Sequence, residues 1–162
     1  MKKFVFTILI LVWTIYASPA SAALKFSPTA AMIGGAGFGG FQISRDKKSP
    51  ATLIFNSTTI DSNNNNLSCG LIGDFEFEDV KIDNGPQLIF GLAGIVSGGK
   101  LVGTSFSSMS LPVFVGVTED FGKFSITGRL SIFKYATTTV GNISTSGIGV
   151  FDTSIITVAY SL

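Results

Sequence analysis

Catalysis would need a nucleophile, a proton carrier or a metal site, and this chain is poor in all three. It has no histidine and one cysteine, Cys69, so neither a Cys–His pair nor a usual zinc ligand set can be assembled. Acids stand close together at Glu76 with Glu78 and at Glu119 with Asp120, and paired acids serve in glycoside hydrolysis. Such acids on a strand or turn are more commonly solvated charge. We therefore expect no enzymatic activity.

Two segments match ligand-binding motifs only in part. The glycines of residues 35–40 have the Gly-x-Gly-x-x-Gly spacing of dinucleotide-binding loops, but the segment neither follows a clear strand nor opens a helix. Oxygen-bearing side chains alternate over residues 61–66 as in a calcium loop. The sixth position, however, is Asn66 rather than glycine, and the twelfth is Ile72 rather than glutamate. We interpret these segments as a turn and a solvated loop, and we expect no cofactor and no metal.

The first 22 residues have the pattern of a secretory signal. Two lysines precede an apolar run over residues 4–16, and Ala20 and Ala22 stand where a signal peptidase reads small side chains. The run is shorter than the roughly 20 residues that a spanning helix needs. Cleavage would leave 162 − 22 = 140 residues, about the size of one domain. We expect a single domain over 23–162, located in the periplasm or at the cell surface.

Charge and cysteine content narrow the possible partners. Loss of the two signal lysines would leave 11 − 2 = 9 basic residues against 10 acidic ones. A nearly neutral chain without a basic block lacks the electrostatic footprint of nucleic-acid binding. The single cysteine excludes an intrachain disulfide, and we interpret Cys69 as a small apolar residue near a strand.

Alternating apolar and polar residues predict strands, and the clearest one lies in the closing stretch, residues 149–160. From Ser154 onward the side chains separate into two sets, and Ile156, Val158 and Tyr160 share one face. Residues 123–132 alternate in the same way. We expect the two segments to be partners in one sheet.

A third alternating segment carries acids. In residues 73–82, Phe75 and Phe77 share one face and Asp74 lies with two further acids on the other. We expect the phenylalanines to be buried and the acids to face solvent.

Turn signals separate about eight short strands, and no segment after the signal has a sustained helical period. We predict an antiparallel β-sandwich of immunoglobulin or pilin-like type, with an eight-stranded β-barrel as the alternative.

Two segments near the carboxy terminus share a pattern with a known family. In that family the first segment has the pattern V-G-G-x-L-x-I and the second has G-x-Y-x-G-x-x-x-V-x-V-x-Y. Residues 124–132 and 149–160 of this chain match these patterns at some positions, and Thr157 does not reproduce a valine of the second. The pattern resembles that of bacterial secreted domains of unknown function that look like fimbrial subunits with an immunoglobulin-like sandwich. The chain departs from it at Thr153, where the family often has glycine, and at one position where phenylalanine replaces tyrosine. The corresponding positions are Gly128, Leu130, Ile132, Gly149, Phe151, Val158 and Tyr160.

The resemblance implies a structural or adhesive role rather than catalysis. Fimbrial-type subunits fill a groove at a sheet edge with a strand donated by a neighbour. The expected partners are therefore copies of this chain or other surface subunits. Residues 24–41 are the candidate donor, and an ordinary first strand followed by a loop is the alternative.

The rival prediction is a small outer-membrane β-barrel, the only prediction in which a membrane is a partner. A secretory signal, a length suited to eight strands and a positive mean hydropathy of +0.50 fit this class. Against it, only Tyr135 and Tyr160 remain after the signal as interfacial-type aromatics, and the chain ends at Leu162 rather than at an aromatic residue.

Overall fold

A computed structural model describes residues 25–44, 50–76 and 85–161 of the 162-residue chain. The predicted signal over residues 1–22, Phe77, Glu78 and Leu162 lie outside the described residues. Within them, no helix is long and apolar enough to cross a membrane. The described residues form nine strands: β1 (Lys25–Ile33), β2 (Ala36–Ser44), β3 (Ala51–Asp61), β4 (Asn64–Glu76), β5 (Gln87–Leu101), β6 (Thr104–Phe121), β7 (Phe124–Val140), β8 (Ile143–Gly149) and β9 (Ser154–Tyr160).

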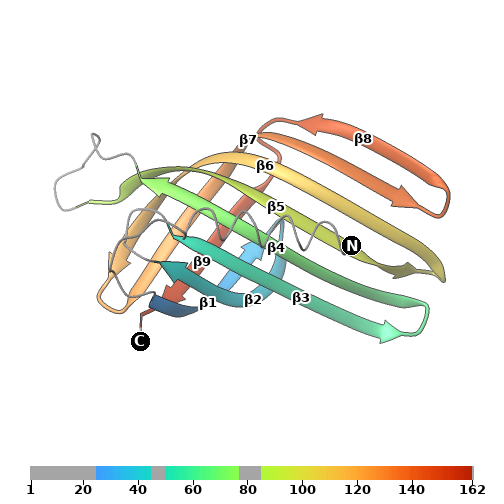
Figure 1. The fold of residues 1–162 in the computed structure, drawn as a ribbon, viewed down its shortest axis with the longest axis horizontal. Coiled ribbons are helices and arrows are strands. Elements are labelled where there is room, and N and C mark those ends of the chain that lie inside the picture. The colour runs from blue at the N-terminus through green and yellow to red at the C-terminus, as the bar shows by residue number, and fades with distance from the viewer. Residues whose placement is uncertain (1–24, 45–49, 77–84, 162) are drawn as a thin grey trace, which may run out of the picture.

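The sheet closes into an eight-stranded antiparallel barrel (Figure 1). Strands β1 to β7 pair in chain order, and β9 completes the ring by pairing with both β7 and β1. Among the described residues, the ninth strand, β8, pairs only with the second half of β7. This half lies beyond the part of β7 that pairs with β9. The predicted β-sandwich is therefore wrong and the alternative, a barrel, is confirmed. The physical reason is that the first and last strands are hydrogen-bonded to each other. The sheet therefore closes on itself and buries its own inner face, which in a sandwich a second sheet would have to cover.

Two pairing predictions can be compared with this register. The expected partnership of the closing strand with residues 123–132 is confirmed, because Ile126 pairs with Val158 and Gly128 with Ile156. The described part of the candidate donor segment, residues 25–41, lies in the barrel wall. There β1 pairs with β2 on one side and with β9 on the other, as an ordinary first strand would.

The face that carries most of the large apolar side chains points outward, which for residues 73–76 is opposite to our expectation. On β9, Ile155 is 1% exposed whereas the exposed fraction of Val158 is 37%. On β4, Asp74 is 3% exposed and Phe75 is 43% exposed, so the acid that we placed in solvent is inside. The interior of an eight-stranded barrel is only wide enough for a limited volume of side chains. Polar and small residues therefore share the interior with a few bulky apolar ones, and most of the large apolar side chains lie outside.

A compact apolar layer occupies part of the interior. It is formed by side chains from six strands of the wall, and Phe114 is its largest member. Glycine makes room for that ring, because a Cβ atom on Gly91 would collide with the Phe114 ring and with the carbonyl oxygen of Gly73. The buried members of the layer are Ala31, Ile54, Ile72, Ala93, Phe114 and Ile155.

We predict that Gly91→Ala lowers the free energy of unfolding by about 1–3 kcal/mol, because the added methyl group overpacks the interior. The matched control is Gly94→Ala on the same strand, whose Cβ would lie 3.6 Å from Cδ2 of Leu111, an ordinary contact. Urea unfolding followed by circular dichroism measures both variants. Equal stability of the two would contradict the proposed close packing at Gly91.

Six strands extend beyond the ring and form what we call the distal sheet. It consists of the parts of β3 to β8 that lie past the ends of β1, β2 and β9, to the right in Figure 1. Hydrogen bonds join its turns: the N–H of Val102 donates to Oδ1 of Asn64 at 3.0 Å, and that of Gly103 to the carbonyl of Asn63 at 2.9 Å. The N–H of Gly141 donates to the carbonyl of Ser105 at 2.8 Å. The three hairpin ends thus form one connected layer.

Candidate functional site

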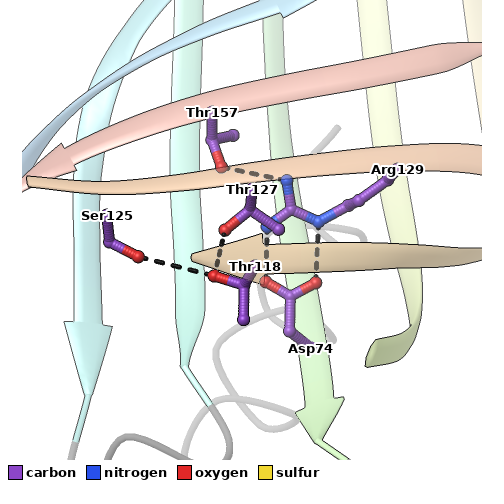
Figure 2. A network of polar contacts seen from close by, with 6 residues as sticks. All are labelled: Asp74, Thr118, Ser125, Thr127, Arg129 and Thr157. Carbon is purple, nitrogen blue, oxygen red and sulfur yellow. Dashed lines mark hydrogen bonds and ion pairs between the residues drawn. The ribbon is translucent and has the colours of Figure 1, made fainter. Parts of the chain in front are cut away.

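The most strongly organised polar group lies inside the barrel, where Arg129 of β7 binds Asp74 of β4 (Figure 2). Nε of Arg129 donates to Oδ1 of Asp74 at 2.7 Å, and Nη2 donates to Oδ2 at 2.5 Å. Such a fork-to-fork pair is the strongest geometry between these groups. Nη1 donates to Oγ1 of Thr157 on β9 at 2.9 Å, and the Arg129 guanidinium carbon lies 5.6 Å from the centre of the Phe114 ring.

This ion pair crosses the interior rather than following the wall. Strands β4 and β7 are separated along the sheet by β5 and β6, so a bond between them must span the lumen. The side chains of Arg129 and Asp74 are 0% and 3% exposed. A buried pair of this kind fixes the relative position of the strands that carry it and occupies the space through which a solute would pass.

A separate group of hydroxyls lies beside the ion pair, toward the end of the barrel that holds the β6–β7 turn. Oγ1 of Thr118 on β6 lies 2.9 Å from Oγ1 of Thr127 and 3.5 Å from Oγ of Ser125, both on β7 (Figure 2). Two further buried hydroxyls, on Thr52 and Ser131, have no hydrogen-bond partner among the described residues. The interior therefore combines one ion pair, several hydroxyls and the apolar layer around Phe114.

The outer surface of the ring is mostly apolar. We call it the apolar belt and define it by exposed hydrophobic side chains that alternate along the strands with interior ones. The outward positions of β6 from Met109 to Val117, and those of β7 from Phe124 to Tyr135, hold no charged residue. The belt includes Phe26, Met32, Phe41, Phe55, Phe75, Phe90, Leu92, Val115, Val117, Phe124, Ile126, Leu130, Phe133, Ile156 and Val158.

An aromatic pair marks the end of the belt near the carboxy terminus. The rings of Phe124 and Tyr160 pair across β7 and β9, with their centroids 5.1 Å apart. Nζ of Lys123 lies 5.7 Å from the centre of the Tyr160 ring. An aromatic side chain beside a lysine at the edge of an apolar surface is the arrangement found where membrane proteins meet the headgroup region.

The seven positions singled out from the sequence do not form one site. Gly128, Leu130, Val158 and Tyr160 lie in the paired part of β7 and β9, where Leu130 and Val158 point out of the barrel. Ile132 lies at a bulge of β7, since Val113 pairs with Phe133 and Phe114 with Ser131. Gly149 ends β8, and Phe151 lies between β8 and β9 with a φ of 54°. The closing stretch, residues 149–160, thus consists of the last residue of β8, a bend and the strand β9.

A second ion pair lies at that bend and had no sequence signal. Nζ of Lys134 lies 2.6 Å from Oδ2 of Asp152 and donates to Oγ1 of Thr153 at 3.0 Å. Hydrogen bonding to Lys134 is the main cause that lowers the pKa of Asp152, and a hydrogen bond from Thr153 also lowers it. Both members are partly exposed, so the pair holds the connection near β7 without a large effect on stability.

The two partial motifs have structural roles. Gly35 lies in the β1–β2 turn with a φ of 87°, and Gly37 and Gly40 belong to β2, so the glycine motif opens a strand rather than a helix. In the acidic loop, Oδ1 of Asp61 accepts hydrogen bonds from the N–H groups of Asn63 and Asn64 at 2.7 and 2.8 Å. That carboxylate is exposed and closes a turn of two residues, 62 and 63. The loop that we expected over residues 61–66 is therefore too long, because β4 already begins at Asn64.

The Asp61 turn has a predictable pH dependence. Hydrogen bonds from the Asn64 side chain, followed by the N–H of Asn63, lower the pKa of Asp61. The stabilisation is therefore complete above the ordinary aspartate pKa of about 4. It is lost as the pH falls through the lowered pKa of the folded protein. We predict that the amide proton shifts of Asn63 and Asn64 titrate with a midpoint below about 4. Asp61→Asn is the control that removes the titration, and a midpoint at or above the ordinary value would contradict the assignment.

Sequence reasoning missed Arg129 as the centre of the interior network. The available signal was its position among hydroxyl side chains on one face of residues 125–131, with Ser125, Thr127 and Ser131. A lone cation among hydroxyls indicates an interior position when the opposite face is continuously apolar. The partner Asp74 lies 55 residues away in the chain, so its identity could not be read from spacing.

Comparisons of this chain with protein-family models, with curated proteins and with solved structures give no match. The resemblance to secreted fimbrial-like domains therefore stays a prediction.

Proposed function

We propose that this chain is an exported, non-enzymatic protein whose barrel is embedded in a bacterial outer membrane and whose distal sheet projects from it as a structural or adhesive surface. The observation that carries this proposal is the inverted distribution of side chains. The wall is apolar outside, whereas the inside holds a buried ion pair and hydroxyl groups. In water this arrangement would expose the large apolar side chains of the belt to solvent. Exposed apolar patches of this kind are rare on soluble monomers.

A lipid surrounding accounts for the belt in several respects. A closed barrel satisfies all backbone groups of its wall, which is a requirement inside a bilayer. Strands β1 and β2 have nine residues each, close to the 9–11 that a tilted spanning strand needs. Above the belt, the distal sheet is rich in serine, threonine, asparagine and glycine, as expected for a part that stands in water.

The interior favours an anchoring and structural role over transport. Arg129, Asp74 and Phe114 lie in the lumen together, and Arg129 contacts both of the others. Eight-stranded barrels have interiors that side chains can fill, unlike the wider barrels that leave an aqueous channel. The distal sheet is then the part of the molecule that meets other molecules.

The fimbrial-type alternative requires an open groove at a sheet edge within the folded subunit. In the described residues the edges of the ring are joined, because β9 bonds to β1. This observation is why we favour the membrane barrel and restrict strand pairing between subunits to the part of the sheet above the ring.

Fractionation of cells that express the full chain tests the proposal. We expect the protein to sediment with outer membranes, to resist extraction with alkaline carbonate and to dissolve in detergent. We also expect unheated samples to migrate differently from boiled ones in gel electrophoresis, because a closed barrel resists unfolding. A soluble periplasmic protein followed in the same fractions is the control. Release of the protein by washing or shearing alone would refute membrane anchoring.

A further inference from the structure

Strand β8 presents an unprotected edge. It bonds to β7 on one side, and no strand of the described residues pairs with its other side. Nearly all of its residues are exposed. Soluble edge strands are commonly blunted by lysine, proline or a bulge. The β8 sequence Ile-Ser-Thr-Ser-Gly-Ile-Gly contains no proline and no charge, and its register with β7 is regular.

The hairpin geometry identifies which backbone groups are free. The two-residue turn between β7 and β8 makes Val140 and Ile143 a hydrogen-bonded pair, and such pairs alternate along an antiparallel ladder. The N–H groups of Ser144, Ser146 and Ile148 are therefore directed away from β7. The 2.8 Å contact between the hydroxyls of Thr139 and Ser144 agrees with a closely spaced, non-hydrogen-bonded pair.

The opposite border of the distal sheet is also open. Strand β2 pairs with β3 only as far as Phe55, and residues 56–61 of β3 continue beyond it. This segment, Asn-Ser-Thr-Thr-Ile-Asp, is again rich in hydroxyl side chains and carries its single charge at its end. It has six residues, and β8 has seven. Since all neighbouring strands are antiparallel, β8 and β3 run in opposite directions along the barrel axis.

We propose that β8 of one molecule pairs with the distal part of β3 of a second copy of this chain. The inference rests on the proposed function, because copies in one membrane share one orientation. In that orientation β8 and the second copy's β3 meet antiparallel, whereas two β8 strands would meet parallel, the slightly weaker arrangement. The two borders match in direction, length and lack of charge. Because the contact joins different surfaces of the two molecules, it extends the distal sheet from copy to copy.

Disulfide trapping in intact membranes tests this contact. In a Cys69→Ser background, one tagged chain carries Ser146→Cys and a second, differently tagged chain carries Ser57→Cys or Thr58→Cys, one for each face of β3. After mild oxidation we expect a cross-linked dimer only when both kinds of chain are expressed together. Dimers from Ser146→Cys alone would overturn the head-to-tail contact, as would the absence of any dimer or a cross-link to a different protein.

A proline variant distinguishes loss of pairing through the edge of β8 from loss of the folded barrel. Here the cross-linking cysteine is moved to position 144, so the chain carries Ser144→Cys together with Ser146→Pro. The proline removes an outward N–H and leaves the hydrogen bonds between β8 and β7 in place. We expect loss of the cross-linked dimer with heat-modifiable migration retained. The matched Ser146→Val variant keeps the N–H and should cross-link like the parent. Equal cross-linking of the two variants would overturn pairing through β8. Membrane anchoring is read independently from migration and fractionation, so its failure is distinguishable from failure of the contact.

Discussion

Replacing Arg129 with methionine should lower the free energy of unfolding by about 3–5 kcal/mol, the largest effect that we expect from a single interior substitution. The substitution leaves the Asp74 carboxylate inside the barrel without its two guanidinium hydrogen bonds, and Thr157 loses a donor. A buried, unpaired carboxylate is costly because it has lost its hydration without gaining a partner. Urea unfolding of the protein in detergent micelles measures the change.

The double variant Arg129→Met with Asp74→Leu is the matched control. Removing both charges at once should restore most of the lost stability, since replacing a whole buried ion pair by apolar residues is often neutral. If the double variant is as unstable as the single one, the loss comes from packing around Phe114 rather than from the uncompensated charge. If Arg129→Met alone is fully stable, the ion pair does not hold β4 and β7 together.

Val158→Arg should be the most damaging change on the outer surface. Val158 points out of the wall on β9 and pairs with Ile126 on β7 and with Ala30 on β1. In a lipid surrounding, an arginine on this face costs about 2–4 kcal/mol near the middle of the bilayer and less toward the interfaces. We expect reduced insertion into the outer membrane and a lower unfolding free energy in lipid vesicles. The same prediction, with a smaller effect, applies to Tyr160→Lys, because Tyr160 lies at the edge of the belt beside Lys123.

The control for Val158→Arg is Thr139→Arg, which is placed on β7 in the distal sheet beyond the belt. It should leave insertion and stability nearly unchanged. This comparison distinguishes an effect of lipid contact from a general effect on folding, because in a water-soluble barrel both outward positions would tolerate arginine. Normal export and stability of Val158→Arg would therefore contradict the proposed lipid contact.

The strands themselves were accessible from the sequence because alternation has a local cause. Successive side chains of a strand point to opposite faces, so residues 154–160 and 123–132 reveal their conformation without reference to the rest of the chain. Their pairing also followed, and the register of Gly128 with Ile156 confirms it. The long strands β5, β6 and β7 were harder to delimit, since glycines and serines at residues 94–110 resemble turn signals although they continue through the distal sheet.

Which face is inside could not be derived from alternation, because a period of two is symmetric. We assigned Phe75 to the core and Asp74 to solvent by the rule for water-soluble sheets, and the structure has them reversed. The choice depends on ring closure, which depends in turn on contacts such as that of Ala30 with Val158, 128 positions apart in the chain (158 − 30 = 128). The Arg129–Asp74 pair is a long-range contact of the same kind, and neither residue alone indicates its partner.

The nearly consecutive order of strands in the ring has a consequence for how the chain reaches its folded state. Six of the eight junctions, from β1–β2 to β6–β7, join neighbours in sequence, so each can form as a hairpin at a small cost in loop-closure entropy. The junction of β9 with β1 instead brings together the two ends of the domain, and it is favourable only once the intervening strands are in place. We therefore expect closure at this seam to limit the folding rate. Substitutions along Thr29–Ile33 should then slow folding more than equally destabilising ones within the β5–β6 hairpin.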